Sequence, residues 1–342
     1  MKGNKSKKVL ISGYYGFNNF GDEAVLSVLI NSLKQEHVND ITVISKDPKS
    51  TRKTHGVRTV YTFNLLGIFF EILRTDVLFS GGGSLLQDVT SSKSLLYYLA
   101  LIVTSLLFGK KVIIFAQGIG PLKNNFLKKL TKYILKKCTF VTVRDERSLE
   151  LLKSWNIPAQ LVCDPVWNFK VSKRYSHNGV GVQLRKWHLL TDEMITALAK
   201  AIAENFPQKK IFIYALQRTQ DKEVCEKLEE KINRINPSVY TQVVTNRNPS
   251  SVSDSFSHLD MMIAMRYHAC LLALKYGIKT LPVIYDPKVE ILSDEFGLNN
   301  RIYLYSSEEI TNAVNSFNSD NYSHNGKQTP VFDFSVYTKY LK

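Results

Sequence analysis

Hydrophobic positions in the first half of the chain form short runs that alternate with amphipathic segments. Apolar runs at 9–11, 41–44, 77–79, 112–115 and 140–143 end in glycine or polar turns, and 22–36 and 124–138 have helical spacing. Short apolar runs bounded by turns are typical of buried strands. Their alternation with helical segments predicts a parallel, doubly wound sheet.

The pattern breaks into polar and aromatic loop at 163–179 and then restarts. Strand-like runs follow at 179–185, 209–217, 239–244 and 279–286, and 260–277 passes from strand to helix. Thr191 is a suitable N-cap for a helix over 191–206. The sequence therefore predicts two Rossmann-like domains, 1–165 and 166–342, facing each other across a cleft. A polar tail after about 315 is able to pack back on the first domain.

The charge of the chain favours an anionic partner. Among 342 residues the formal net charge is +15, which attracts phosphorylated substrates, nucleic acid or anionic lipid. No helix-turn-helix, zinc-finger or RNA-binding aromatic signature supports nucleic acid. The four cysteines are scattered and form no CxxC pair, so we expect free thiols, no zinc ribbon and a cytoplasmic location.

The longest apolar stretch covers 95–108. It is shorter than the roughly 20 residues that span a bilayer, so it predicts a core helix, with contact at a membrane face as the alternative.

A glycine-rich loop, SGYYGFNNFGDEAVL at 12–26, joins the first predicted strand to a helix. It fits neither GxGxxG nor a P-loop. Gly16 and Gly21 allow backbone amides to approach a ligand, the helix N-terminus favours an anion, and Asn18 and Asn19 offer further donors. The alternative is a tight turn whose following acids only complement the helix dipole.

A second glycine loop follows the strand at 77–80 and contains Gly82, Gly83 and Ser84, with Asp88 just beyond. Consecutive glycines are entropically costly, so a close backbone approach is expected there. The approach of a ligand and close packing of helix on strand both remain open.

Arginines end two predicted strands. Arg144 suits a carboxylate or phosphate, with a surface ion pair to Asp145 or Glu146 as the alternative. Arg185 ends the first strand of the second half, where it is able to bind an anion, and Trp187 is able to stack on a sugar ring. A surface arginine and an anchoring aromatic explain that pair equally well.

The sharpest group of candidates lies in MRYHACLLALKYG and the YDPK that follows it. Arg266 and His268 alternate where a strand meets a helix, so both are able to enter one crevice. The helix N-terminus favours a neutral imidazole, which accepts a proton at pH 7. Lys288 follows the next strand.

Six segments in this order resemble the polysaccharide pyruvyl transferase family, most closely its bacterial cell-surface-anchoring type. They are SGYYGFNNFGDEAVL, FSGGGSLLQDVTSSKSLLYYL, FAQGIGPL, VTVRDERSLELL, CDPVW and MRYHACLLALKYG with YDPKV. The second half also resembles the nucleotide-side domain of GT-B glycosyltransferases, which implies a GT-B-like arrangement.

The resemblance implies that phosphoenolpyruvate donates a pyruvyl ketal to two hydroxyls of a sugar and releases phosphate. The implied acceptor is N-acetylmannosamine in a lipid-linked cell-wall polysaccharide precursor, and no cofactor or metal is expected. The assignments are catalytic roles for His268, Arg266 and Arg144; phosphoenolpyruvate binding by Gly16, Asn18, Asn19, Gly21 and Lys288; and acceptor binding by Gly82, Gly83, Ser84, Asp88, Arg185 and Trp187.

Two other functions remain open. A GT-B glycosyltransferase would bind a nucleotide sugar in place of phosphoenolpyruvate, and a non-catalytic module would bind anionic polysaccharide and tolerate loss of His268. The basic amphipathic helix at 124–138 also suits peripheral contact with the inner membrane leaflet, with an ordinary solvated helix face as the alternative.

Overall fold

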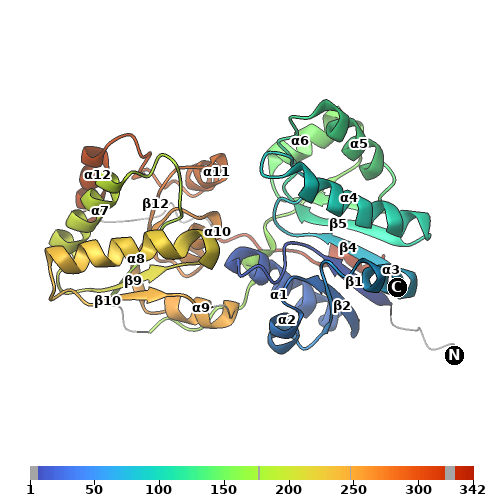
Figure 1. The fold of residues 1–342 in the computed structure, drawn as a ribbon, viewed down its shortest axis with the longest axis horizontal. Coiled ribbons are helices and arrows are strands. Elements are labelled where there is room, and N and C mark those ends of the chain that lie inside the picture. The colour runs from blue at the N-terminus through green and yellow to red at the C-terminus, as the bar shows by residue number, and fades with distance from the viewer. Residues whose placement is uncertain (1–6, 176–177, 247, 320–327) are drawn as a thin grey trace. The chain divides into compact units, whose positions relative to one another are not determined.

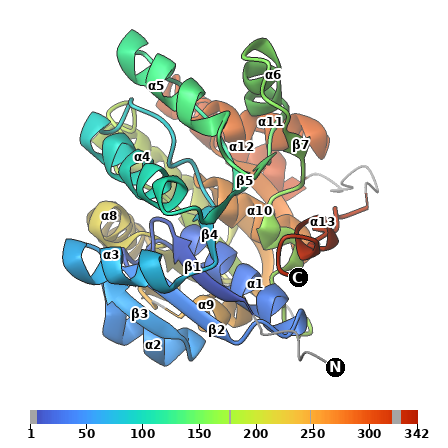
Figure 2. The same cartoon turned by 90° about the vertical axis from the view of Figure 1, so that its right-hand side faces the viewer.

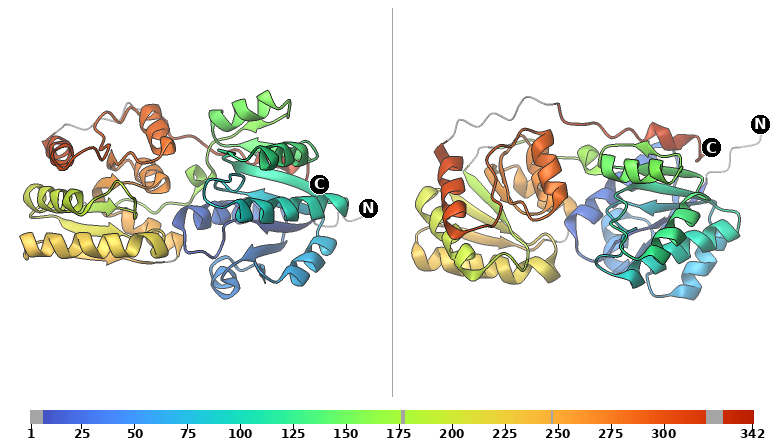
Figure 3. Two further views of the ribbon diagram at one scale, coloured as in Figure 1. Left: turned by 45° about the horizontal axis from the view of Figure 1, so that its top comes forward. Right: turned by 90° about the horizontal axis from the view of Figure 1, so that it is seen from above.

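The chain forms two compact units (Figure 1). The computed structural model describes residues 7–175, 178–246, 248–319 and 328–342. The first unit contains Met1–Phe17, Gly21–Phe169 and Pro330–Lys342, and the second contains Asn18–Phe20 and Lys170–Thr329. Each unit has one parallel β-sheet with helices outside it, which Figure 3 shows from two further directions.

The sheet of the first unit has seven strands in the order β3-β2-β1-β4-β5-β6-β7. All neighbouring pairs are parallel. Its central strands are buried almost throughout, as parallel strands covered on both faces must be. The strands are β1 (Lys8–Ser12), β2 (Asp40–Ser45), β3 (Arg58–Tyr61), β4 (Val77–Gly81), β5 (Lys111–Gln117), β6 (Phe140–Val143) and β7 (Gln160–Leu161).

Four helices of the first unit pack on the same hydrophobic cluster. Ile68, Leu99, Ile134 and Leu152 are buried contributions from these four helices. In Figure 2, three of them lie one above the other along one side of the sheet. They are α3 (Leu65–Arg74), α4 (Ser92–Leu107) and α5 (Asn125–Leu135), and α6 (Glu146–Ser154) is the fourth; α1 (Phe20–Gln35), α2 (Pro48–His55), η1 (Pro165–Asn168) and α13 (Ser335–Thr338) complete the unit.

Helix α4 contains the longest apolar stretch of the sequence. Leu95, Leu99 and Ile102 are buried in the core, which matches the predicted core helix. Among the residues that the structure describes, no helix has both the length and the apolar character needed to cross a bilayer.

The C-terminal segment returns to the first sheet. The Tyr337 ring lies 5.2 Å from the Phe115 ring and 6.1 Å from that of Phe79. Its hydroxyl lies 2.7 Å from Thr142 Oγ1. Thr142 Oγ1 already donates to the Ile114 carbonyl at 2.9 Å, so Tyr337 is the donor between the two hydroxyls. Burial is the main cause that raises the pKa of Tyr337, which keeps the phenol protonated.

Tyr337→Phe is therefore expected to remove one hydrogen bond without stranding a polar group. Thr142 Oγ1 keeps its bond to Ile114 and still accepts from the Ala116 amide at 2.8 Å. We expect a loss of about 1 kcal/mol in the free energy of unfolding, measured by urea titration. A loss above roughly 3 kcal/mol would contradict this account of the bond.

The sheet of the second unit has five parallel strands in the order β10-β9-β8-β11-β12. Its strands are β8 (Gly179–Gln183), β9 (Lys210–Tyr214), β10 (Thr241–Val244), β11 (Leu259–Ala264) and β12 (Lys279–Pro282). Its helices are α7 (Asp192–Asn205), α8 (Arg218–Ile235), α9 (Pro249–Phe256), α10 (Tyr267–Lys275), α11 (Pro287–Glu295) and α12 (Ser307–Ser319).

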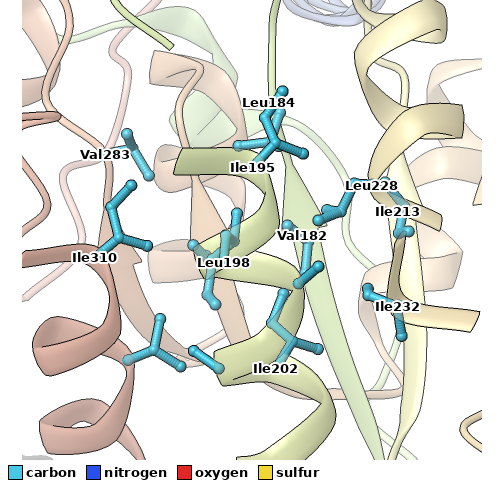
Figure 4. Close-up of a cluster of buried hydrophobic side chains, with 14 of the residues drawn as sticks. Val182, Leu184, Ile195, Leu198, Ile202, Ile213, Leu228, Ile232, Val283 and Ile310 are labelled. Carbon is cyan, nitrogen blue, oxygen red and sulfur yellow. The ribbon is translucent and has the colours of Figure 1, made fainter. Parts of the chain in front are cut away.

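The core of the second unit joins three helices to the sheet. Leu198 of α7 lies at the centre of the cluster, with Leu228 of α8, Ile310 of α12 and Val182 of β8 around it (Figure 4). Thr191 caps α7 as predicted, accepting from the Met194 amide at 3.3 Å. This packing fixes the strands whose ends carry the candidate residues.

Strand order reverses at an equivalent place in both sheets. The chain moves outward from β1 in one direction and from β4 in the other, and β8 and β11 repeat this arrangement. Ligands of doubly wound proteins bind beside such switch points, at the carboxyl ends of the strands. The two glycine loops follow β1 and β4, while Arg185 and Arg266 follow β8 and β11. The predicted fold class, two Rossmann-like parallel α/β folds, is confirmed.

Candidate functional site

Arg266 lies at the switch point of the second sheet, between β11 and α10. Its Nε and Nη2 donate to the two carboxylate oxygens of Asp221 at 2.7 and 2.5 Å. Asp221 lies in the first turn of α8 and is fully buried. The bidentate pair fixes both the position and the plane of the guanidinium.

Asp221 also ties together the ends of neighbouring strands. Besides Arg266, its Oδ2 accepts from the Gln217 amide at 2.8 Å and from Gln183 Nε2 at 3.3 Å. Gln183 Oε1 in turn accepts from the Arg266 amide at 2.7 Å. One buried carboxylate therefore organises the carboxyl ends of β8, β9 and β11.

Part of the first glycine loop belongs to this edge of the second unit. Asn19 forms an antiparallel bridge with Gln217, and the Phe20 amide donates to the Leu216 carbonyl at 2.9 Å. Asn18 adopts a positive φ of 58°, which asparagine tolerates better than most residues. The structure thus places Asn18 and Asn19 in the same unit as Arg266 and beside a residue that Asp221 holds.

Arg185 is surrounded by neutral groups. Its Nη1 donates to Tyr285 Oη at 3.1 Å and its Nη2 to Gln220 Oε1 at 2.8 Å. Its guanidinium carbon lies 5.1 Å from the centre of the Tyr285 ring and 5.7 Å from that of Trp187. Burial is the main cause that raises the pKa of Tyr285, so the phenol carries no compensating charge.

The two arginines meet at one acceptor. Arg266 Nη2 lies 3.2 Å from Gln220 Oε1, the oxygen to which Arg185 also donates. Asp221 balances the charge of Arg266, but every hydrogen-bond partner of Arg185 in the described residues is neutral. This edge therefore carries net positive charge, which suits an anion.

His268 and Lys288 follow neighbouring strands of the same sheet. His268 is the second residue of α10, is half-buried, and its ring lies 5.1 Å from the Tyr267 ring. Lys288 is the second residue of α11, which follows β12, and its amide donates to Asp286 at 2.9 Å. The topology thus brings Arg266, His268 and Lys288 to one sheet edge.

Arg144 has a similar buried partner in the first unit. Its Nη1 pairs with Asp164 Oδ2 at 2.5 Å, and its Nη2 lies 3.4 Å from Ser84 Oγ. The ion pair is therefore with Asp164, and Asp145 instead caps α6 by accepting from the Ser148 amide at 2.8 Å. Arg144 thus forms a buried ion pair in place of the surface pair that was the alternative, and its predicted role toward an anionic ligand stays a prediction.

The Gly16 amide has an internal acceptor. It donates to Glu23 Oε1 at 2.6 Å, so Glu23 fixes the loop in addition to complementing the dipole of α1. The φ of Gly16 is +78°, and a Cβ there would overlap the Ser45 hydroxyl and the Asp47 amide. Gly21 is buried in the first turn of α1. Gly16 is thus explained by loop geometry.

Gly16→Ala is expected to destabilise the first unit more than Gly56→Ala does. Both positions have positive φ, which costs a residue other than glycine roughly 1 kcal/mol. A Cβ at Gly56 meets nothing within 4 Å, whereas one at Gly16 clashes with the neighbouring loop. Comparing the thermal unfolding of both variants separates the effect of the clash from that of the backbone strain. Equal losses of stability in the two variants would contradict a clash at Gly16.

Packing also explains the second glycine loop. Gly82 and Gly83 have φ of +80° and +76°. A Cβ on Gly82 would lie 2.5 Å from Val25 Cγ1, and one on Gly83 would lie 2.7 Å from Asp22 Oδ1, both on α1. These glycines therefore allow α1 to pack closely against the loop that follows β4. Close packing of helix on strand was one of the two explanations left open by the sequence.

Asp88 caps the segment before α5. Its two carboxylate oxygens accept from the Lys123 and Asn124 amides at 2.8 and 2.7 Å. Burial on its own would raise the pKa of Asp88, but these hydrogen bonds outweigh it and the pKa is lowered. The geometry gives Asp88 a structural role, and its predicted contact with an acceptor stays a prediction.

The sequence alone does not identify Asp164 and Asp221, the two aspartates that pair with Arg144 and Arg266. Asp221 stands in a helix rich in lysine and glutamate, where nothing distinguishes it from a surface charge. Asp221 stands three residues after the start of α8. This position indicates a site residue only when α8 is known to follow β9, which ends at Tyr214. In residues 7–175, 178–246, 248–319 and 328–342, no three His, Cys, Asp or Glu side chains are grouped to hold a metal ion.

Several solved structures have a similar fold. A UDP-GlcNAc 2-epimerase from Methanocaldococcus jannaschii superposes with a TM-score of 0.67 at 11% identity, covering 95% of this chain and 95% of that one. A glycosyltransferase from Rickettsia africae gives 0.54 at 11% identity, covering 94% and 95%. At such identity the likeness concerns the fold alone, which is GT-B-like. No curated protein matches the chain.

The sequence itself matches a protein-family model over residues 19–287. That range begins in the first glycine loop, contains both buried arginine–aspartate pairs, and ends at the first residue of α11. The matched family is described as polysaccharide pyruvyl transferase, and because the match covers most of the chain, this protein belongs to that family.

Proposed function

We propose that the protein transfers the pyruvyl group of phosphoenolpyruvate to two hydroxyls of a sugar in a cell-wall polysaccharide precursor. N-acetylmannosamine is the proposed sugar, in a lipid-linked precursor on the cytoplasmic side of the membrane. Family membership supports pyruvyl transfer to a polysaccharide. The choice of phosphoenolpyruvate as the donor rests on one observation. Arg185 and Arg266 both donate a hydrogen bond to Gln220 Oε1, so two guanidinium groups lie close together.

Phosphoenolpyruvate carries a phosphate and a carboxylate. Its site therefore needs cationic side chains whose charge is not already neutralised by neighbouring carboxylates of the protein. Arg185 supplies such a charge, because its partners are a phenol, an amide and aromatic rings. We therefore assign Arg185 to the donor's anionic groups, in place of the acceptor contact expected from the sequence, and Arg266 to the same edge, held by Asp221. Lys288 and the amides of Asn18 and Asn19 are proposed as further donors.

The chemistry requires two proton movements. C3 of the enol gains a proton as one sugar hydroxyl adds to C2, and that hydroxyl loses its proton. The second hydroxyl then attacks C2, the C2–O bond to phosphate breaks, and the proton of that hydroxyl leaves with inorganic phosphate. His268 is proposed as the general acid or base for this transfer. The fixed guanidinium groups stabilise charge on the departing phosphate.

Roles in the first unit follow the same proposal. Arg144 is held by Asp164 at the carboxyl end of β6, next to Ser84. We propose that this edge contacts the sugar acceptor through Ser84 and the backbone of Gly82 and Gly83, with Arg144 assisting the reaction.

The test is release of phosphate from phosphoenolpyruvate by the purified full chain. Acceptors are synthetic and lipid-linked N-acetylmannosamine glycosides, with reactions lacking acceptor as controls. Acceptor-dependent release, with a product heavier by one pyruvyl ketal, supports the proposal.

A parallel binding measurement separates donor from acceptor. Calorimetric titration with phosphoenolpyruvate should give heat that Arg185→Gln abolishes and Arg234→Gln, on an exposed turn of α8, leaves unchanged. If phosphoenolpyruvate does not bind and a UDP-sugar does, glycosyl transfer replaces pyruvyl transfer as the function. Binding of polysaccharide without turnover of either donor would favour the non-catalytic module.

A further inference from the structure

Helix α3 is apolar on the side that faces solvent. Ile68 and Ile72 are its buried residues, and Ile68 packs in the core together with α4. Leu66 and Phe70 are 74% and 64% exposed, although neither is polar. An exposed apolar patch of this kind marks an interaction site. We call it the α3 strip, which consists of Leu65, Leu66, Phe69, Phe70 and Leu73 with Phe108 beyond the end of α4.

The strip is continuous across two segments of the chain. The Phe69 ring meets the Phe108 ring edge-on at 5.4 Å and the Phe70 ring at 5.9 Å. Figure 2 shows α3 and α4 side by side on one face of the first sheet. The apolar surface therefore extends past a single helix.

Basic side chains stand at both ends of the strip. At the N-terminal end of α3, Lys46 Nζ lies 4.5 Å from the centre of the Phe63 ring, which is itself exposed. At the C-terminal end, Lys110 Nζ donates to the Leu73 carbonyl at 2.7 Å. An apolar band with cations at its borders is the pattern of segments that lie in a membrane interface.

A basic cavity adjoins the C-terminal end of the strip. It has a volume of about 250 Å³ and is lined by Lys7, Lys110, Lys111, Thr75 and Phe108, among others. Its one carboxylate, Asp76, accepts from the Lys8 amide at 2.8 Å. Three lysines and one aspartate line the cavity, so its charge favours an anionic group, and Phe108 belongs to both the cavity and the strip.

The acidic residues near α3 are already compensated. Asp40 pairs with Arg58 and Arg74, and Glu71 accepts from Thr42 Oγ1 at 3.0 Å and lies 3.6 Å from Arg74. The surface that faces outward is therefore apolar and basic.

We infer that the α3 strip docks the protein on an anionic lipid bilayer, with its apolar side chains among the acyl chains and a lipid phosphate in the adjoining basic cavity. Charge favours a bilayer over a second copy of the chain, because two copies of net charge +15 repel each other and an anionic surface attracts both. This docking surface differs from the basic helix α5 that the sequence suggested.

The strip also connects with the candidate site. It begins where β3 ends, and the Lys46 amide donates to the Tyr15 carbonyl of the glycine loop at 2.9 Å. A bilayer seated along the strip would reach the carboxyl edge of the first sheet at the N-terminal end of α3, while the basic cavity lies at the amino ends of β1, β4 and β5. This orientation, which rests on the proposed function, would bring a lipid-linked acceptor to the loops that follow β1 and β4.

The test is co-sedimentation of the full chain with vesicles, without phosphoenolpyruvate or acceptor. We expect binding to vesicles of phosphatidylcholine mixed with phosphatidylglycerol, and at least about tenfold weaker binding to pure phosphatidylcholine. Leu66→Asp/Phe70→Asp should weaken binding to the mixed vesicles by at least about tenfold. The control, Ile291→Asp/Tyr305→Asp, changes the same charge at two exposed apolar residues of the second unit and should bind normally.

A second variant reports insertion directly. Tryptophan at position 70, in Phe70→Trp, should be quenched by brominated lipids in mixed vesicles, whereas Tyr305→Trp should not. Absence of quenching, or equal binding by the Leu66→Asp/Phe70→Asp variant, would overturn the inference. Loss of a concentration-dependent dimer in that variant would assign the strip to a second copy and overturn it as well.

Failure here is distinguishable from failure of the proposed reaction. Phosphate release with a soluble acceptor needs no membrane, so Leu66→Asp/Phe70→Asp should retain it. Vesicle binding needs no donor, so it stands even where no phosphate is released.

Discussion

Asp221→Ala is expected to lower the free energy of unfolding of the second unit by about 3–5 kcal/mol, the usual cost of breaking a buried ion pair. Asp221 is fully buried, and the Arg266 side chain is 12% exposed. Alanine removes an acceptor shared by the Arg266 guanidinium, the Gln217 amide and Gln183 Nε2. The guanidinium is then left buried without a counter-charge. Urea unfolding followed by fluorescence and circular dichroism measures the loss.

Asp192→Ala is the matched control for that variant. Asp192 also lies in the first turn of a helix of the second unit, where it pairs with Lys227 and Lys231 at the surface. Water and salt screen these pairs, so their loss should have a much smaller effect. A loss at Asp221 as small as that at Asp192 would contradict the structural role of the buried pair.

Removal of both charges should restore much of the lost stability. Well-packed apolar residues often replace a buried ion pair at little cost, so Asp221→Leu/Arg266→Met is expected to be more stable than Asp221→Ala. The double variant should nevertheless be inactive, because the proposed donor site has lost a cation. This separation of stability from activity identifies Asp221 as a positioning residue that acts through Arg266.

The two units use the same arrangement at their strand ends. In each, an arginine at the carboxyl end of a strand is fixed by an aspartate from a distant part of the chain, Arg144 by Asp164 and Arg266 by Asp221. A buried guanidinium needs such a counter-charge, because burial without one is prohibitive. The pairing fixes the direction of each arginine before any ligand binds, which lowers the cost of binding an anion.

The sequence predicted the strands well because most of them are buried on both faces. Such strands are continuous apolar runs, and β4 and β5 are read from Val77–Gly81 and Lys111–Gln117 with little ambiguity. The candidate residues follow from the same pattern, since each stands just after such a run. Strand order then places the residues after β1 and β4, and those after β8 and β11, at the switch points.

Other features depend on contacts distant in sequence and could not be predicted. Asp221 resembles the surface charges around it, and only the end of β11 reveals its partner. Helix α3 is mostly apolar, and only the packing of the first unit shows that Ile68 and Ile72 face the core while Leu66 and Phe70 face solvent. The sequence indicates that the tail is able to pack on the first domain, but its polar pattern does not show that rings such as Phe332 and Tyr337 make the contact.

His268→Ala is expected to lower kcat for phosphate release by about 10²–10⁴-fold, the usual contribution of a positioned general acid or base. His268 is the second residue of α10, two residues after the arginine that Asp221 fixes. The KM for phosphoenolpyruvate should change little, because the proposed anion contacts come from Arg185 and Arg266.

His258→Ala provides the control, because His258 and His268 flank β11 at its two opposite ends. His258 is exposed and precedes β11, where its ring stacks on Tyr175 at 5.4 Å, whereas His268 follows the carboxyl end of β11. The proposed mechanism requires that only the carboxyl-end histidine matter. If His268→Ala kept activity within a few-fold of the native protein, proton transfer would have to come from another group. Equal losses in both variants would point to a general effect on folding of the second unit.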